Sequence, residues 1–299
     1  MRVRTLTMLL LSLAGSTAGW AGGAWLPGTG HGTMFSGFSR KTANTSWDAD
    51  GVSFENTGRF QNHDFRYFYL NGEVGLAPRL SALFLFTYLD GFEGPTGELR
   101  RNTGPSDTWL GLKIELTDGE LKSALRLTLR TAELYDIDGP YSSELYDEDG
   151  EFLSHSPEWR GLLKEDYTIE GVLSRSFEGG KDWGIASAGY TYRAGAPADQ
   201  VPIYLEGGRW FSSNRIALKL ETYWTLSLGN DSPREPDDRF GARPGFNFND
   251  ASMGRVGASF IVPFGKGGKW SVTAGYNVWV WGRSARQYQE PFVNIGRAF

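Results

Sequence analysis

The chain has 299 residues, a net charge of −5 and no cysteine. The lack of cysteine excludes disulfides, thiolate zinc sites and a cysteine nucleophile, and the absence of a basic patch argues against a nucleic-acid partner. Aromatic residues make up 14% of the chain and 40 residues are Gly, while the mean hydropathy is −0.37. Such a composition, without a long apolar run, is typical of β proteins whose strands are apolar on one face.

The amino-terminus has the layout of a secretory signal peptide. Residues 1–4 contain two arginines, residues 6–14 are mainly apolar, and mostly small residues follow up to Ala24. This apolar stretch is too short to span a bilayer. We expect cleavage after Ala21, with Ala24 as the alternative, so that residues 1–21 are a signal peptide and residues 22–299 form a single exported domain.

Twelve segments follow in which apolar and polar side chains alternate with the period of a β-strand. Residues 109–116, for example, place Leu110 and Leu112 on one face and Gly111 and Lys113 on the other. In chain order the predicted strands lie near 32–41, 64–76, 80–90, 108–117, 121–135, 166–177, 182–194, 202–211, 215–228, 251–264, 270–283 and 290–299.

The connections between these strands alternate in length. Short turns at 77–79, 118–120, 178–181, 212–214 and 265–269 are separated by longer polar stretches near 42–63, 91–107, 136–165, 195–201, 229–250 and 284–289. Short periplasmic turns and long extracellular loops are the rule for outer-membrane barrels, whereas a β-sandwich has no reason to alternate in this way. The sequence therefore predicts an all-β, transmembrane, antiparallel up-and-down barrel of about twelve strands. We expect it in the outer membrane of a Gram-negative bacterium, with both termini periplasmic.

Aromatic residues lie near the ends of the predicted strands. The last strand ends on Phe299, which we expect to close the barrel and to be recognised by the barrel assembly machinery, although Arg297 stands where an apolar residue is expected. Interfacial girdles of aromatic residues are typical of such barrels. We expect seven tryptophans in them: Trp109, Trp183, Trp210, Trp224, Trp270, Trp279 and Trp281.

If the apolar faces point to lipid, the charged faces point inward, because a charge in hydrocarbon is costly. Eleven residues are then candidates for lining the lumen: Glu73, Lys113, Glu115, Lys122, Arg126, Arg130, Glu170, Glu206, Lys219, Glu221 and Arg255. They could form a structural network that fills the lumen or a polar channel that steers a solute. The mixed signs argue against strong selectivity for anions or cations.

The spacing Asp-x-Asp-Gly occurs three times in two of the predicted loops, 42–63 and 136–165. Carboxylates two residues apart can share a Ca²⁺ ion, and the candidate ligands are Asp48, Asp50, Asp136, Asp138, Asp147 and Asp149. None of the loops continues into a full EF-hand pattern, and a solvated turn is the favoured interpretation. We therefore expect no metal or other cofactor.

Catalytic chemistry has little support in the sequence. The only histidines are His31, His63 and His155. His63 is followed by Asp64, but adjacent residues on a strand point to opposite faces and cannot form a relay. We therefore expect that the protein is not an enzyme.

Three segments carry a family resemblance: Gly23-Ala-Trp-Leu-Pro-Gly28, Gly75-Leu-Ala-Pro-Arg-Leu-Ser81 and Gly104-Pro-Ser-Asp-Thr-Trp-Leu-Gly-Leu-Lys113. With them the chain resembles a family of outer-membrane transporters named after the meta-pathway of phenol degradation. The resemblance covers most of the mature chain as a pattern and implies a barrel that passes small, often aromatic, compounds. It identifies no binding residues.

The leading hypothesis is passive or facilitated transport of a small solute, for which the resemblance suggests an aromatic or hydrophobic compound. The alternatives are a structural surface barrel, with a closed ion-paired lumen and loops that bind a partner or lipopolysaccharide, and a lipid-modifying enzyme. The expected partners are the solute, outer-membrane lipid, lipopolysaccharide and the assembly machinery.

Overall fold

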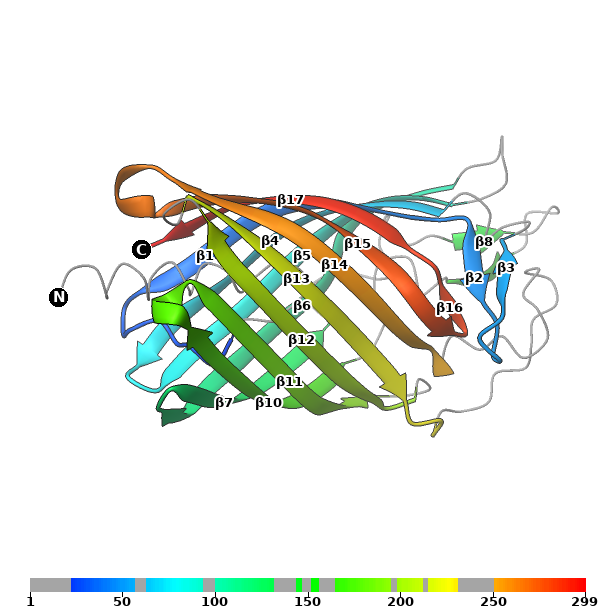
Figure 1. Ribbon diagram of the computed structural model, residues 1–299. Coiled ribbons are helices and arrows are strands. Elements are labelled where there is room, and N and C mark those ends of the chain that lie inside the picture. The colour runs from blue at the N-terminus through cyan, green and yellow to red at the C-terminus, as the bar shows by residue number, and fades with distance from the viewer. Residues whose placement is uncertain are drawn as a thin grey trace.

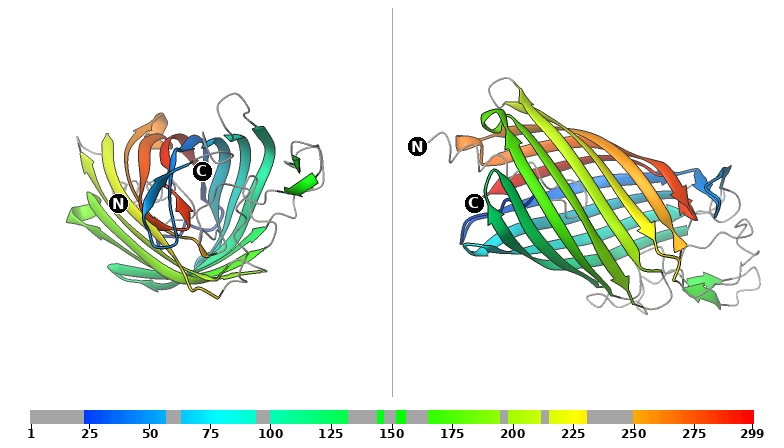
Figure 2. Two further views of the ribbon diagram at one scale, coloured as in Figure 1. Left: turned by 90° about the vertical axis from the view of Figure 1, so that its right-hand side faces the viewer. Right: turned by 60° about the horizontal axis from the view of Figure 1, so that its bottom comes forward.

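A computed structural model describes residues 23–56, 63–93, 100–131, 144–146, 152–155, 165–194, 198–211, 215–230 and 250–299. Twelve strands form a closed antiparallel barrel, as the sequence predicts (Figure 1). The view along the barrel shows these strands closing into a ring (Figure 2). In the described ranges, no helix is long and apolar enough to cross a membrane. The predicted signal peptide, residues 1–21, lies outside the described residues and stays a prediction.

Each barrel strand pairs with the next one along the wall, and the last strand closes on the first. The barrel therefore leaves none of its own strands with an unpaired edge. The strands are β1 (Gly32–Ala43), β4 (His63–Ala77), β5 (Leu80–Glu93), β6 (Arg100–Asp118), β7 (Leu121–Thr131), β10 (Asp166–Phe177), β11 (Asp182–Arg193), β12 (Gln200–Phe211), β13 (Ile216–Ser227), β14 (Ser252–Phe264), β15 (Trp270–Arg283) and β17 (Gln289–Ala298).

The observed strands match the predicted segments closely, and the main departure is β6. It begins at Arg100 and pairs with β5 from Glu93 onward, so most of the loop predicted over 91–107 is strand. Polar cross-strand contacts extend this pairing: the Thr103 hydroxyl donates to Asp90 Oδ1 at 2.8 Å. The sequence did not predict this extension because its residues are mostly polar, and a strand is recognised in a sequence by alternating apolar residues.

The two ends of the barrel differ. The end that carries the short connections, here the turn end, also holds both ends of the barrel sheet: Gly32 N donates to Phe299 O at 3.1 Å, and Phe299 N donates to Gly32 O at 3.0 Å. The opposite end, here the loop end, carries additional short strands (Figure 1). These are β2 (Thr45–Trp47), β3 (Ser53–Glu55) and β16 (Ala285–Arg286), which form one small sheet, and the pair β8 (Glu144–Tyr146) and β9 (Phe152–His155).

Apolar side chains cover the outer face of the wall. On β13, Leu220 is 56% exposed, whereas its neighbours Lys219 and Glu221 are buried, and the same alternation recurs around the barrel. An exposed apolar belt over a buried polar interior is the arrangement that suits a barrel in hydrocarbon.

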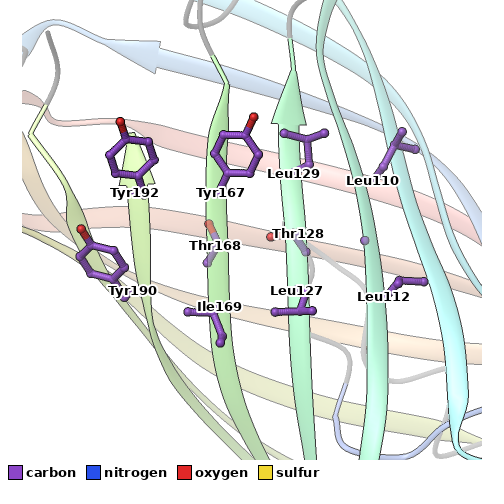
Figure 3. A pocket seen from close by; sticks show the side chains of 11 residues that line it. Leu110, Leu112, Leu127, Thr128, Leu129, Tyr167, Thr168, Ile169, Tyr190 and Tyr192 are labelled. Carbon is purple, nitrogen blue, oxygen red and sulfur yellow. The ribbon is translucent and has the colours of Figure 1, made fainter. Parts of the chain in front are cut away.

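A groove of about 640 Å³ lies on this outer face, across β6, β7, β10 and β11 (Figure 3). Two rows of outward side chains form its walls, and Thr128 and Thr168 lie between them. One row is Leu110, Leu129, Tyr167 and Tyr192, and the other is Leu112, Leu127, Ile169 and Tyr190. Because the groove opens away from the lumen, it belongs to the apolar outer surface and not to a path through the barrel.

The predicted tryptophan girdle is wrong for four of its members. Trp109 faces the lumen, on the same side of β6 as Lys113 and opposite Arg130. Trp183, Trp210 and Trp279 are buried. Trp210, for example, shares the inner face of β12 with Glu206, because the two lie an even number of residues apart. Trp270 does face outward at the turn end, where the Arg297 guanidinium lies 5.2 Å from its ring centroid. Arg297 thus covers an aromatic ring at the end of the barrel and does not point into the lumen.

Candidate functional site in the barrel lumen

The largest ion-pair network on the inner face centres on Lys219. Its ammonium lies 2.6 Å from Glu221 and 3.5 Å from Glu206, and the Lys219 side chain is only 1% exposed. Arg255 continues the network, with distances of 3.4 Å to Glu221 and 3.6 Å to Glu290. A buried charge is tolerated only when it is paired in this way. The network therefore runs along the inner wall from β12 to β17.

The other predicted lumen residues pair on the opposite wall. Lys113 lies 2.7 Å from Glu73, and Lys122 lies 3.6 Å from Glu115 near the turn end. Arg126 binds Glu170 through two nitrogens, at 2.8 Å from Nε and 2.7 Å from Nη2. Arg130 pairs with Asp166 and lies 3.6 Å from Asp107. All eleven predicted residues are thus buried or partly buried and paired, in several separate groups.

Five more charged residues take part, and the sequence reasoning missed them. They are Lys41, Asp107, Asp166, Arg193 and Glu290. Asp166 and Glu170 share a face of β10, so the alternation that identified Glu170 could have found Asp166 at the first position of the strand. Together the sixteen residues include eight cations and eight carboxylates, so the named charges balance.

Toward the turn end, one side of the lumen is apolar. Side chains from β1 and from β10 to β14 pack into one buried cluster: Phe35, Val172, Trp183, Ile185, Tyr204, Trp210, Ala217 and Ile261. The rings of Trp183 and Trp210 lie 6.0 Å apart. Two polar atoms join this cluster to the charged network, since Trp183 Nε1 donates to Glu206 at 2.7 Å and the Tyr204 hydroxyl also donates to Glu206.

Residues 23–28, here called the amino-terminal segment, complete this apolar layer from inside the barrel. Ala24 is fully buried, and Trp25 and Leu26 pack against the same cluster. The Ala24 N–H donates to Ser174 Oγ on β10 at 2.6 Å. Four strands separate β10 from β1 on the shorter side of the barrel, so the segment must cross the lumen to reach Ser174.

Lys113 and Gly75 hold the amino-terminal segment in place. The Lys113 ammonium donates to the carbonyl oxygens of Gly23 at 2.9 Å and Trp25 at 3.0 Å, in addition to Glu73. Where the segment leaves the lumen, Gly30 N donates to Gly75 O at 2.9 Å. A Cβ atom on Gly75 would lie 2.3 Å from Gly28 O, so only glycine permits this close approach.

The loop end carries the predicted calcium candidates that the structure describes. Asp48 Oδ1 accepts hydrogen bonds from the backbone N–H groups of Asp50 at 3.0 Å and Val52 at 2.8 Å, which is the geometry of a turn. Asp136, Asp138, Asp147 and Asp149 lie outside the described residues. Among the residues that the structure describes, no group of three His, Cys, Asp or Glu side chains could hold a metal ion.

The described histidine side chains lie at opposite ends of the barrel. His31 Nδ1 is 3.3 Å from Phe299 O at the turn end, and His63 Nε2 is 3.1 Å from the Tyr288 hydroxyl at the loop end. The side chain of His155 lies outside the described part.

Comparisons with known proteins identify the fold. No family model and no curated protein matches the sequence. The barrel is similar to the crystal structure of an outer membrane channel from Pseudomonas putida F1, with a TM-score of 0.62 and 11% identity over 92% of this chain and 97% of that chain.

Two other similar structures are described as a porin and as a channel. One is the KdgM porin in complex with disordered oligogalacturonate, with a TM-score of 0.47 and 6% identity over 89% of this chain and 99% of that one. The other is a mutant of the TodX monoaromatic hydrocarbon channel, with a TM-score of 0.46 and 9% identity over 92% of each chain. At these identities the likeness concerns the fold alone. The chain has the fold of an outer membrane channel.

Proposed function

We propose that this protein is an outer-membrane channel for passive passage of a small solute, and that the amino-terminal segment closes the turn end of the path. The turn end would face the periplasm, as expected for short connections. The fold of an outer membrane channel and the charged inner wall support this proposal.

The apolar layer at the turn end carries the proposal, because part of this layer comes from residues outside the barrel wall. Wall side chains supply most of it, but residues 23–28 complete it without belonging to any barrel strand. Hydrogen bonds from Lys113 and to Ser174, together with apolar packing, hold the segment. Such contacts can break while the barrel sheet stays intact, because the closed ladder does not depend on them.

The second candidate is a structural barrel with a closed, ion-paired lumen. The tight burial of the Lys219 network favours it, since paired charges that are almost fully buried act as a filled interior. The two candidates differ in whether displacing the amino-terminal segment opens a path.

Planar-bilayer recordings of matched glycine variants test this difference. Gly75→Ala forces a Cβ against the Gly28 backbone, whereas a Cβ on Gly171 has no atom within 4 Å. We expect rare openings for the native barrel, frequent openings for Gly75→Ala and for deletion of residues 23–28, and native behaviour for Gly171→Ala. Folded protein is verified by heat-modifiable migration on gels.

A lack of channel events in all variants, together with unchanged solute uptake by cells that lack or express the protein, would contradict the proposal. That combination would leave the structural barrel as the better account.

A further inference from the structure

Arg126 and Arg193 are two of the inner-wall arginines that have a buried N–H group without a hydrogen-bond partner. Arg126 uses Nε and Nη2 on Glu170, so its Nη1 points away from that carboxylate, and this nitrogen is buried with no partner. Arg193 Nε is also buried without a hydrogen bond, and an Asp166 oxygen lies 3.7 Å away. The two side chains are 3% and 7% exposed. Buried cationic donors of this kind favour the approach of an acceptor.

The strand register places these donors around a row of small hydroxyl side chains. Arg126, Thr128 and Arg130 alternate on β7, and their partners on β10 are Glu170, Thr168 and Asp166. The next strand, β11, continues the rows with Gly189, Thr191 and Arg193. Thr128, Thr168 and Thr191, here called the threonine row, therefore lie between two charged rows. The Thr168 and Thr191 hydroxyls are 2.9 Å apart.

The dimensions of this wall suit a small ligand. Residues two apart on a strand are separated by about 7 Å. A ligand of a few atoms over the threonine row can therefore reach a charged row while it accepts hydrogen bonds from hydroxyl groups. Trp109 adds a flat apolar surface at one side, since Arg130 Cζ lies 5.8 Å from its ring centroid.

We propose that the inner wall formed by β7, β10 and β11 binds a small carboxylate with a flat apolar body. A carboxylate accepts parallel hydrogen bonds from guanidinium and hydroxyl donors, and an aromatic or similarly flat body can pack against Trp109. The named charges of the lumen balance as a whole, so the preference for an anion comes from these donors and not from the net charge of the lumen. The site deepens the proposed channel function and rests on it, since the carboxylate would be the class of solute that the channel carries.

Isothermal titration of the purified mature barrel in detergent micelles with sodium benzoate tests the site. Benzyl alcohol serves as the neutral probe of similar shape. The paired variant Arg126→Gln with Glu170→Gln removes both charges and keeps side chains of similar size, so that no buried carboxylate is left alone. Arg193→Gln tests the second donor. Arg175→Gln is the matched control, because Arg175 lies on the outer side of β10 with its side chain 48% exposed.

We expect saturable binding of benzoate and none of benzyl alcohol. The paired variant should weaken benzoate binding about tenfold or more, because it removes a charged donor, and the control should bind as the native barrel does. Absence of saturable benzoate binding to the native barrel, equal binding of both probes, or native affinity in both the paired and the Arg193 variants would overturn the proposal.

Bilayer recordings on the same samples separate this proposal from the channel proposal. A barrel that conducts and does not bind benzoate overturns the carboxylate site alone. A barrel that binds benzoate saturably, with the expected loss in the variants, and never conducts supports the site and contradicts the channel.

Discussion

The two halves of the lumen are filled by different kinds of contact. Toward the loop end, charges such as Arg255 and Glu290 belong to wall strands and hold one another in place, and their network extends to Lys219, which borders the apolar cluster. In the turn-end half, an apolar cluster from the wall is completed by residues 23–28, which lie outside the barrel sheet. Displacing a charged side chain of the wall leaves its partner buried without a counter-charge. Displacing the amino-terminal segment breaks only a few hydrogen bonds and exposes apolar surface. Under the channel proposal, the turn-end half is therefore where we expect the lumen to open.

The largest expected effect comes from the charged half. Lys219→Met leaves Glu206 and Glu221 buried without their shared cation, and breaking a buried ion pair in this way costs about 3–5 kcal/mol. We expect a matching loss in the free energy of unfolding, measured by denaturant titration in lipid vesicles. Lys266→Met, in an exposed turn, is the control and should be neutral. A neutral Lys219→Met would show that the charged half is not held by its pairs.

A smaller effect is expected where the two halves meet. Trp183→Phe keeps an aromatic ring in the apolar cluster and removes the indole N–H that donates to Glu206 at 2.7 Å. Loss of a hydrogen bond to a buried charged group costs about 2 kcal/mol. The same vesicle titration measures this loss, with Trp270→Phe on the outer face as its control. If both variants lose equal stability, the hydrogen bond from Trp183 to Glu206 does not contribute to the stability of the barrel.

The smallest effect is expected outside the lumen. Arg297→Leu removes a guanidinium that lies over the Trp270 ring, a contact worth about 0.5–1 kcal/mol at an exposed site. We expect a change in unfolding free energy within that range and unchanged channel recordings. Folding of the variant in cells is monitored by heat-modifiable migration on gels. Faster folding than that of the native chain would indicate that Arg297 slows recognition of the last strand by the assembly machinery.

The sequence predicted the wall better than the contents of the lumen. Alternating residues such as Leu110, Leu112 and Lys113 locate a strand and its faces, because a strand has a period of two. The same alternation identified Lys219 and Glu221 as inward-facing. It missed Glu290, the partner of Arg255, because that pair joins residues from β14 and β17, which are far apart in the sequence.

The apolar layer was missed for a different reason. Trp183 and Trp210 lie near strand ends, where a tryptophan can face either lipid or the lumen, and position alone does not decide between the two. The segment Gly23-Ala-Trp-Leu-Pro-Gly28 carried a family resemblance in the sequence but no local sign of its location. Its contact with Ser174 joins residues 150 positions apart. Such a contact leaves no periodic pattern in a single sequence.

Reversible cross-linking of the amino-terminal segment tests the central claim most directly. The native chain contains no cysteine, so Ala24→Cys with Ser174→Cys introduces the only pair able to form a disulfide, at a place where Ala24 N and Ser174 Oγ are 2.6 Å apart. We predict that the oxidised barrel shows no openings in a planar bilayer and that a reductant restores the native openings. Equal openings before and after reduction, with the disulfide verified by mass, would contradict the account.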